Sequence, residues 1–248
     1  MKNIICYVLL FTVSFQLTAQ DISSDTSTTS KWEFDVAPYV WLAGSSGTIS
    51  FLNQSANVDA KFKDVLENLK FGMFLHAEAK KGKWIVFGDL MYIKVEKTGN
   101  IELTNTATNI ELKQTVAEIG GGYNLITTLD KWLFIDGLAG LRYFEIDNLV
   151  NVGQQQLLDR TINVTDPFIG IRFRTVSDKW TNGARFDVGG FGIGSNLSWK
   201  ANFLVDYQFS ELLSLSIGYQ VYSIDYEKDT FRLDLVSSGF ATGLNFHF

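Results

Sequence analysis

The chain ends with the stretch GFATGLNFHF, residues 239–248, in which large apolar side chains alternate with small or polar ones. Alternation with a period of two is the pattern of a β-strand with one apolar face. The apolar parity carries Phe240, Leu244, Phe246 and Phe248. The other parity carries Gly239, Ala241, Gly243, Asn245 and His247. The stretch therefore predicts a C-terminal strand that is apolar on one side only.

Four of the six tryptophans directly follow a lysine, and the last three of these pairs are spaced 48 residues apart. That spacing fits an up-strand, a long loop, a down-strand and a short turn. Tryptophan favours the membrane–water interface, where a neighbouring lysine reaches toward water. The sequence therefore predicts an all-β protein, a transmembrane antiparallel up-and-down β-barrel, with an aromatic rim formed by Trp32, Trp84, Trp132 and Trp180.

Alternating segments predict about ten strands, most of them longer than the roughly 9–11 residues that a tilted strand needs to cross a bilayer. The expected strands are 32–43, 69–80, 84–97, 110–125, 132–145, 163–176, 180–194, 197–209, 212–226 and 231–248. Eight and twelve are the alternative counts. Twelve would result if Thr48–Leu52 and Asn57–Phe62 formed a further hairpin. The helical spacing within Phe62–Leu69 indicates either a short helix over the mouth of the barrel or an ordered loop.

The predicted connections alternate in length. Short ones are expected at 80–83, 126–131, 177–179 and 210–211, and long ones at 44–68, 98–109 and 147–162. Outer-membrane barrels have short periplasmic turns and longer external loops. The alternation and the even strand number therefore place both ends of the barrel on the periplasmic side.

The N-terminus has the pattern of a secretory signal. Lys2 precedes the mainly apolar segment Ile4–Phe15, which is too short to span a bilayer as a helix. We expect a signal peptide over residues 1–19, a polar periplasmic leader over 20–31 and an outer-membrane barrel over 32–248. The only cysteine, Cys6, lies in the signal, so the mature chain would have neither disulfides nor a cysteine-ligated metal. No cofactor is expected.

Two partners follow from this location. One is the lipid of the outer membrane. The other is the barrel assembly machinery, because a terminal aromatic at this parity resembles the signal that the machinery reads, here Phe240, Leu244, Phe246 and Phe248. The formal net charge of −6 provides no basic stripe for phosphates, which argues against nucleic acid. The sequence does not indicate an oligomeric state.

On the strands between residues 110 and 209, charged and apolar residues occupy alternate positions and therefore lie on opposite faces of the sheet. A lipid-facing Arg or Lys at the bilayer midplane costs about 2–4 kcal/mol, so these side chains are expected to face the lumen. The balance of signs favours a ladder of ion pairs filling a narrow barrel over a conduction path, which is more often lined by one sign. The expected network is Glu118, Asp136, Arg142, Asp166, Arg172, Arg174, Arg185, Asp187, Lys200 and Asp206.

Parity is ambiguous at two places. Strict alternation puts Trp132 on the face of Asp136, so either a bulge near Gly137 shifts the register or this tryptophan points inward. On the strand 84–97, the apolar residues Ile85, Phe87, Met91 and Ile93 share the face of Asp89.

Enzymatic chemistry has little support in the sequence. Acyl transfer needs a nucleophile with a base in reach. The only histidines are His76 and His247, and Ser214 and Ser216 are the inward serines of the strand 212–226. Nothing in the sequence brings a serine and a histidine together, and we expect no catalytic or metal-binding residues.

The N-terminal third resembles a broad group of uncharacterised Gram-negative outer-membrane β-barrel proteins, loosely OmpA-like in architecture. The resemblance covers about Ala37–Lys97 and is carried by Ala37-Pro38-Tyr39-Val40-Trp41 with Gly44 and Gly47, Phe62-Lys63-Asp64-Val65-Leu66 with Leu69, and Gly82-Lys83-Trp84, Phe87-Gly88-Asp89 and Tyr92. It implies the location and the fold, and it transfers no ligand or catalytic residue.

The function expected from the sequence is that of an integral outer-membrane barrel with a structural or surface-interaction role and a lumen filled by ion pairs. The first alternative is a porin-like narrow channel or transporter for small solutes, gated by the segment 62–69. The second alternative is an outer-membrane hydrolase.

Overall fold

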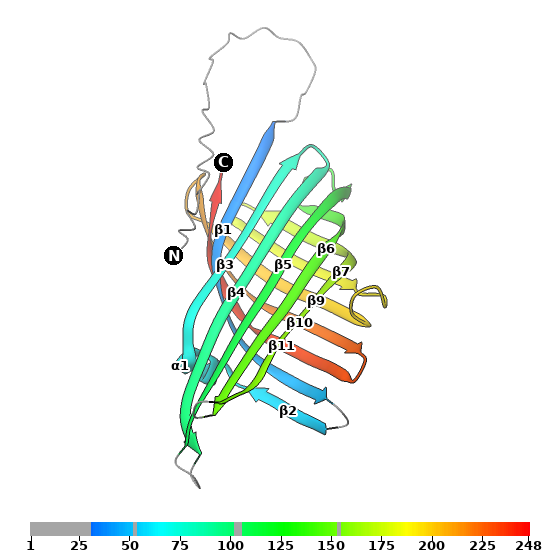
Figure 1. Ribbon diagram of the computed structural model, residues 1–248. Helices are drawn as coiled ribbons and strands as arrows, with labels where there is room; N and C mark the ends of the chain where they lie inside the picture. Colours follow the sequence, from blue (N-terminus) through cyan, green and yellow to red (C-terminus); the bar gives the residue numbers. More distant parts are fainter. Residues whose placement is uncertain (1–30, 52–53, 102–105, 153–154) are drawn as a thin grey trace, which may run out of the picture. The chain divides into compact units, whose positions relative to one another are not determined.

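The computed structural model describes residues 31–51, 54–101, 106–152 and 155–248. The expected signal peptide 1–19 and all but the last residue of the expected leader 20–31 lie outside the described residues. The described chain forms β1 (Trp32–Phe51), β2 (Gln54–Ala60), α1 (Phe62–Asn68), β3 (Leu69–Lys81), β4 (Trp84–Ile101), β5 (Thr106–Thr127), β6 (Leu133–Val152), β7 (Gln155–Ser177), β8 (Trp180–Gly189), β9 (Leu197–Gln208), β10 (Leu213–Lys228) and β11 (Phe231–His247) (Figure 1).

Ten of these strands close into an antiparallel up-and-down barrel. β1 and β3 through β11 pair in chain order, and β11 returns to pair with β1. Closure removes the free edges that an open sheet would expose. The fold class and the expected count of ten strands are confirmed, and the alternatives of eight and twelve are wrong. The expected strand 32–43 continues to Phe51, and the further hairpin considered for Thr48–Leu52 and Asn57–Phe62 forms between Ser45–Phe51 of β1 and β2, on the edge of β1 opposite β11, without adding strands to the ring.

The two ends of the barrel differ, as Figure 1 shows. The turn end is where β1 begins, β11 ends and the short connections after β3, β5 and β7 lie. The hairpin end is the opposite one, with α1 and β2. No helix in the described part of the chain is both long enough and apolar enough to cross a membrane.

Two predicted loops are strands instead. β4 and β5 pair as far as Ile101 with Thr106, and β6 and β7 pair as far as Val152 with Gln155. The expected loops at 98–109 and 147–162 were therefore wrong, because the ladders continue beyond the apolar part of the wall.

The outer wall becomes charged along these long hairpins. Glu111 Oε2 lies 2.8 Å from Lys94 Nζ, and Glu111 Oε1 lies 2.9 Å from Lys113 Nζ. Charges on an outer wall belong in water rather than in lipid, so this part of the hairpins extends past the membrane. Hydrogen bonds from Lys94 and Lys113 hold the pKa of Glu111 below its ordinary value.

The expected strand 180–194 ends early. β8 stops at Gly189, and the next three residues have left-handed φ angles: 88° at Gly190, 51° at Phe191 and 73° at Gly192. Such angles cannot continue a strand, and glycine adopts them at no steric cost. The connection at the hairpin end between β8 and β9 is therefore a tight turn.

Side chains alternate between the two faces of the wall. On β5, Glu118 is 5% exposed and its neighbour Ile119 is 64% exposed. The four tryptophans Trp32, Trp84, Trp132 and Trp180 lie at the turn end and are about half exposed or more. Of the two explanations offered for Trp132, the bulge near Gly137 is present, but it lies on β5 between Asn124 and Ile126 and so does not shift the alternation along β6. β6 begins at Leu133, so the alternation of the strand does not apply to the tryptophan that precedes it.

The wall between β1 and β3 is paired over part of its height only. Pairing of β1 with β3 runs from Trp32 to Pro38, and pairing with β2 begins at Ser45. Residues 39–44 of β1 thus pair on one side only, with β11.

Helix α1 follows β2, contacts β1 and β4, and begins where the backbone N–H of Lys61 donates to Asp64 Oδ2 at 3.2 Å. The segment 62–68 is helical, as one of the two sequence interpretations proposed.

Candidate functional site

The hairpin-end half of the lumen is apolar. A buried cluster, called here the apolar cluster, consists of Met91, Val116, Phe144, Ile146, Ile162, Val164, Tyr222, Ile224, Phe231, Leu233 and Leu235. Side chains in protein interiors pack with few voids larger than a water molecule. The prediction of a lumen filled by ion pairs was therefore incomplete, because parity alone does not distinguish an apolar lumen face from an apolar lipid face.

The middle of the lumen holds a set of charged side chains, called here the central ion cluster: Glu118, Arg142, Arg185, Asp187 and Lys200. Arg142 Nε lies 2.7 Å from Glu118 Oε1, and its Nη2 bonds Asp187 on β8, two strands away. Arg185 Nη2 and Lys200 Nζ reach across to Glu118 at 3.0 and 3.3 Å. Arg142 and Glu118 are direct partners on the neighbouring strands β6 and β5, but the other three pairs join strands that are not neighbours and so bridge the lumen.

Aromatic rings cover the guanidinium groups of this cluster. The Arg142 guanidinium lies 5.0 Å from the ring centre of Phe168 and 5.1 Å from that of Tyr222. Arg185 lies 4.9 Å from the ring centre of Phe87. Cation–π contacts strengthen when water is excluded. These contacts offset the cost of burying Arg142 Nη1, a nitrogen that has no hydrogen-bond partner in the described part of the chain.

A second set of charges lies toward the turn end and is called here the turn-end ion cluster: Asp35, Glu78, Lys80, Asp136, Arg172 and Arg174. Arg172 on β7 binds Glu78 on β3 through two nitrogens, at 2.5 and 3.2 Å, and donates its Nε to Asp136 at 3.0 Å. Lys80 Nζ lies 3.0 Å from Glu78 and 2.8 Å from Asp35. This cluster also bridges the lumen.

Two of the ten residues predicted to form the ion-pair network bind hydroxyl and amide groups instead. Asp166 accepts hydrogen bonds from the backbone N–H and the Oγ of Ser195, at 2.7 and 2.6 Å, and so holds the turn between β8 and β9. Asp206 accepts a hydrogen bond from Ser216 on the neighbouring strand. Assigning Asp166 and Asp206 to ion pairs was wrong, because the alternation along a strand predicts that a carboxylate faces the lumen but not which group it binds there. The other eight lie in the two ion clusters.

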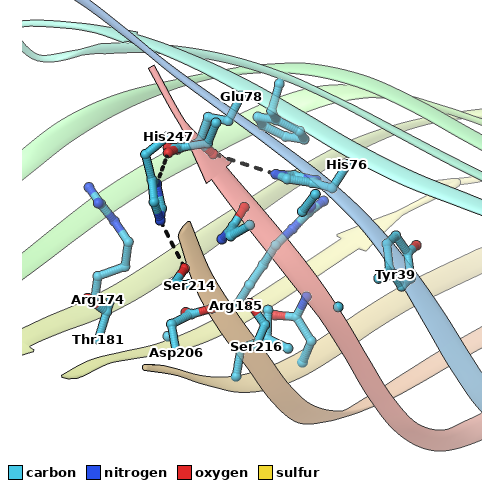
Figure 2. A pocket seen from close by; sticks show the side chains of 18 of the residues that line it. Tyr39, His76, Glu78, Arg174, Thr181, Arg185, Asp206, Ser214, Ser216 and His247 are labelled. Atoms are coloured by element: carbon cyan, nitrogen blue, oxygen red, sulfur yellow. Dashed lines mark hydrogen bonds and ion pairs between the residues drawn. The ribbon is translucent and has the colours of Figure 1, made fainter. Parts of the chain in front are cut away.

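A cavity of about 590 Å³ occupies the lumen between the turn end and the central ion cluster. Its lining runs from Phe248 and Glu211 near the strand ends to Arg185 and Lys200 deep inside. The wall is mixed in charge and includes both histidines of the chain. Figure 2 shows the labelled side chains of this cavity, with Ser214, His247 and Asp206 grouped on one side.

His247 connects a serine and an aspartate in this cavity. Its Nε2 lies 2.9 Å from Ser214 Oγ on β10, and its Nδ1 lies 2.6 Å from Asp35 Oδ1 on β1 (Figure 2 marks the serine contact). The barrel closure places these groups. Asp35 is paired directly with His247 in the β1–β11 register, and β10 is the other neighbour of β11. Three adjoining strands thus bring a hydroxyl, an imidazole and a carboxylate into one row.

The second histidine has a different environment. His76 Nδ1 lies 3.1 Å from Asp89 Oδ2, and Tyr39 donates its phenol to Asp89 Oδ1 at 2.8 Å. The other ring nitrogen of His76 faces Glu78 at 4.0 Å. No described hydroxyl group contacts that nitrogen, so this pair lacks a nucleophile. Within the described ranges, no three His, Cys, Asp or Glu side chains are grouped to hold a metal ion.

Sequence reasoning missed Asp35, Glu78 and Lys80 as members of the polar network, and it did not connect Ser214 with His247. A usable signal was present. Asp35 and His247 are both inward residues next to the turn end, one on the first strand and one on the last. Closing the barrel makes these strands neighbours, so the two side chains have to meet once the register is known.

A scan with protein-family models and a search of curated sequences gave no match. Among solved structures, the chain is similar to the outer membrane protease OmpT from Escherichia coli, with a TM-score of 0.55 and 9% identity over 90% of this chain and 99% of that one. It is also similar to the attachment invasion locus protein Ail of Yersinia pestis (TM-score 0.36, 10% identity, 88% and 99% of the chains) and to Neisserial surface protein A (TM-score 0.34, 14% identity, 87% and 97%). These are Gram-negative outer-membrane β-barrel proteins, and the likeness to OmpT shows that this chain has their fold.

Proposed function

We propose that this protein is an integral outer-membrane barrel that does not conduct, with a lumen closed toward the cell exterior and open toward the periplasm. It is exported by the signal peptide 1–19, followed by the leader 20–31. The barrel assembly machinery inserts it by reading Phe240, Leu244, Phe246 and Phe248 at the end of the chain, where Phe240 and Leu244 are exposed on β11. Membrane lipid surrounds the wall, and the tryptophans Trp32, Trp84, Trp132 and Trp180 mark the periplasmic interface.

The observation that supports a closed lumen is the order of its contents. The apolar cluster lies on the hairpin side, the central ion cluster spans the middle, and the cavity of about 590 Å³ lies on the turn side alone. Ions passing through would have to cross apolar packing and then break buried ion pairs. A filled interior is typical of small barrels, whereas conducting barrels keep a polar, water-lined path.

The long hairpins support a role at the cell surface. β4–β5 and β6–β7 continue past the apolar wall and carry Lys94, Glu111, Lys113 and Asp147 on their outer faces. Polar strands that extend beyond the membrane are exposed to water and can contact other molecules at the cell surface. The protein therefore acts in the envelope as a structural or surface-interacting barrel.

We expect no ion-conducting steps when the purified protein is inserted into planar lipid bilayers. The double variant Phe144→Ala with Tyr222→Ala removes two buried rings whose centres lie 6.0 Å apart in the apolar cluster. Any leak should appear in that variant and not in the wild type. Phe186→Ala, which changes a lipid-facing ring that is 52% exposed, is the matched control and should stay silent. Stable conductance steps in the wild-type protein would contradict a closed lumen.

A further inference from the structure

We propose that Ser214, His247 and Asp35 form a hydrolytic site that cleaves short-chain carboxylic esters reaching the cavity from the turn end. The proposal goes beyond a closed envelope barrel and does not depend on whether the lumen conducts. It rests on two short contacts in one row, 2.9 Å between Ser214 Oγ and His247 Nε2 and 2.6 Å between His247 Nδ1 and Asp35 Oδ1. The same row opens onto a cavity, because all three residues line it.

The contacts fix the direction of each hydrogen bond. An ionised carboxylate can only accept, so His247 Nδ1 carries a proton and donates it to Asp35. In the neutral imidazole Nε2 is then an acceptor, and the Ser214 hydroxyl donates to it. This is the arrangement in which a histidine removes the proton of a serine that attacks a carbonyl.

Asp35 is held in place from a second side. Its Oδ2 accepts from Lys80 Nζ at 2.8 Å, while its Oδ1 accepts from His247. Lys80 also binds Glu78, and Glu78 binds Arg172 across the lumen. Asp35 is a positioning residue for His247, and the turn-end ion cluster fixes its orientation.

The chemical steps balance with water as the co-reactant. Ser214 Oγ attacks the ester carbonyl carbon while its proton passes to His247 Nε2. The tetrahedral intermediate collapses, the alcohol leaves with the proton from His247, and the acyl group stays on Ser214. Water then attacks the acyl-serine as His247 Nε2 takes one proton of the water. Collapse releases the carboxylic acid and returns the proton to Ser214.

A donor for the developing oxyanion is available next to the serine. Asn245 is the direct partner of Ser214 in the β10–β11 register, and it lines the cavity. Its Oδ1 is buried and has no hydrogen-bond partner in the described chain. Rotation of the amide by half a turn exchanges this oxygen for the Nδ2–H₂ group, which donates to an oxyanion.

The cavity sets the class of substrate. Ser214 lines the cavity of about 590 Å³, so the scissile bond has to enter this cavity rather than approach from the outer wall. Ser214 is also only 2% exposed, so only a small group can reach its Oγ. Charged groups line that space, including Arg174 and Lys179. A long acyl chain would have to leave water for a wall rich in charges. The geometry therefore favours a short acyl group on a small polar alcohol.

A different role for the same contacts would be to fasten the closing seam between β11 and β1. Protein purified from outer membranes distinguishes the two roles. Reaction with a fluorophosphonate probe, followed by mass spectrometry of the peptides, is expected to modify Ser214 in the folded wild type. p-Nitrophenyl butyrate is expected to be hydrolysed, with release of nitrophenol.

Three variants separate catalysis from folding, with heat-modifiable gel mobility as the check that the barrel is intact. Ser214→Ala should remove both probe labelling and hydrolysis, and His247→Gln should lower turnover by about a hundredfold or more. Ser237→Ala changes another buried serine, which bonds Ser45 on the seam, and should leave hydrolysis unchanged. Absence of labelling and of hydrolysis in folded wild type would overturn the proposal. So would labelling or hydrolysis that persists in Ser214→Ala.

Discussion

Replacing Arg142 by alanine is expected to lower the free energy of unfolding of the barrel by about 3–5 kcal/mol, the typical loss when one partner of a buried ion pair is removed. The Arg142 side chain is fully buried and contacts Glu118 and Asp187, each of which is almost fully buried as well. Alanine would leave these carboxylates with fewer cations in a region that water does not reach. It would also remove the cation that lies over Phe168 and Tyr222.

Urea-induced unfolding followed by tryptophan fluorescence measures this difference. The matched control is Arg232→Ala, because the Arg232 side chain is 53% exposed and its Nη2 lies 3.8 Å from Asp225. An exposed pair of this kind contributes about 1 kcal/mol or less. Equal losses for the two variants would show that the central ion cluster does not hold the barrel together.

Phe144→Ala is expected to lower the free energy of unfolding by about 3–5 kcal/mol, as for other large-to-small changes at buried aromatic positions. Phe144 is 1% exposed and packs in the apolar cluster, with its ring 6.0 Å from that of Tyr222. The neighbouring side chains can fill only part of the space that the ring leaves. The remaining cavity deprives these side chains of van der Waals attraction, and this cost adds to the loss of apolar burial.

The same strand provides the control for that change. Leu141 points away from the lumen and is 51% exposed. Lipid acyl chains are fluid and fill the space left by Leu141→Ala. The free energy of unfolding should therefore fall much less than for Phe144→Ala. The same unfolding experiment in lipid vesicles compares them. A larger loss for Leu141→Ala would mean that the two faces of β6 have been exchanged.

Much of the fold could be predicted because the signals for a barrel wall are local. The Lys-Trp pairs, the turn lengths and the alternation of the last strand depend on neighbouring residues. Strand ends were less predictable. The paired strands β4–β5 and β6–β7 continue beyond their apolar segments into polar sequence. β8, by contrast, ends before its apolar segment does, because Gly190 and the two residues after it have left-handed φ angles.

The contents of the lumen were harder to predict, because two apolar faces of a strand look alike in sequence. Phe87 and Met91 share the parity of Asp89 and are buried inside the barrel, while Val86 on the other parity is 52% exposed. Which face is the lumen depends on the remaining strands. Within the apolar part of the wall the charges indicate the inward parity, whereas along the long hairpins Lys94, Glu111 and Lys113 lie on the outer face. Charges also do not show how much of the lumen is apolar.

The Ser214–His247–Asp35 row could not be read from spacing, since Asp35 and His247 are separated by 212 positions in the chain. Their contact depends on the register in which β11 meets β1, and that register follows from the closure of the whole ring. The inward parity of each residue was nevertheless predictable. The sequence thus predicted that each of these side chains faces the lumen, but not which side chain it contacts there.

Spin-label accessibility along β4 tests the central claim most directly, namely that alternate side chains of this wall meet lipid and lumen. Six single-cysteine variants of the mature protein would carry the label, three at outward positions (Val86, Leu90 and Tyr92) and three at inward positions (Ile85, Phe87 and Met91). In lipid vesicles the outward labels should collide often with oxygen and rarely with a water-soluble nickel reagent, and the inward labels should collide with oxygen much less often than the outward ones. Collision rates that do not alternate along the strand, or outward labels that meet the nickel reagent freely, would contradict a membrane-spanning barrel with this lumen.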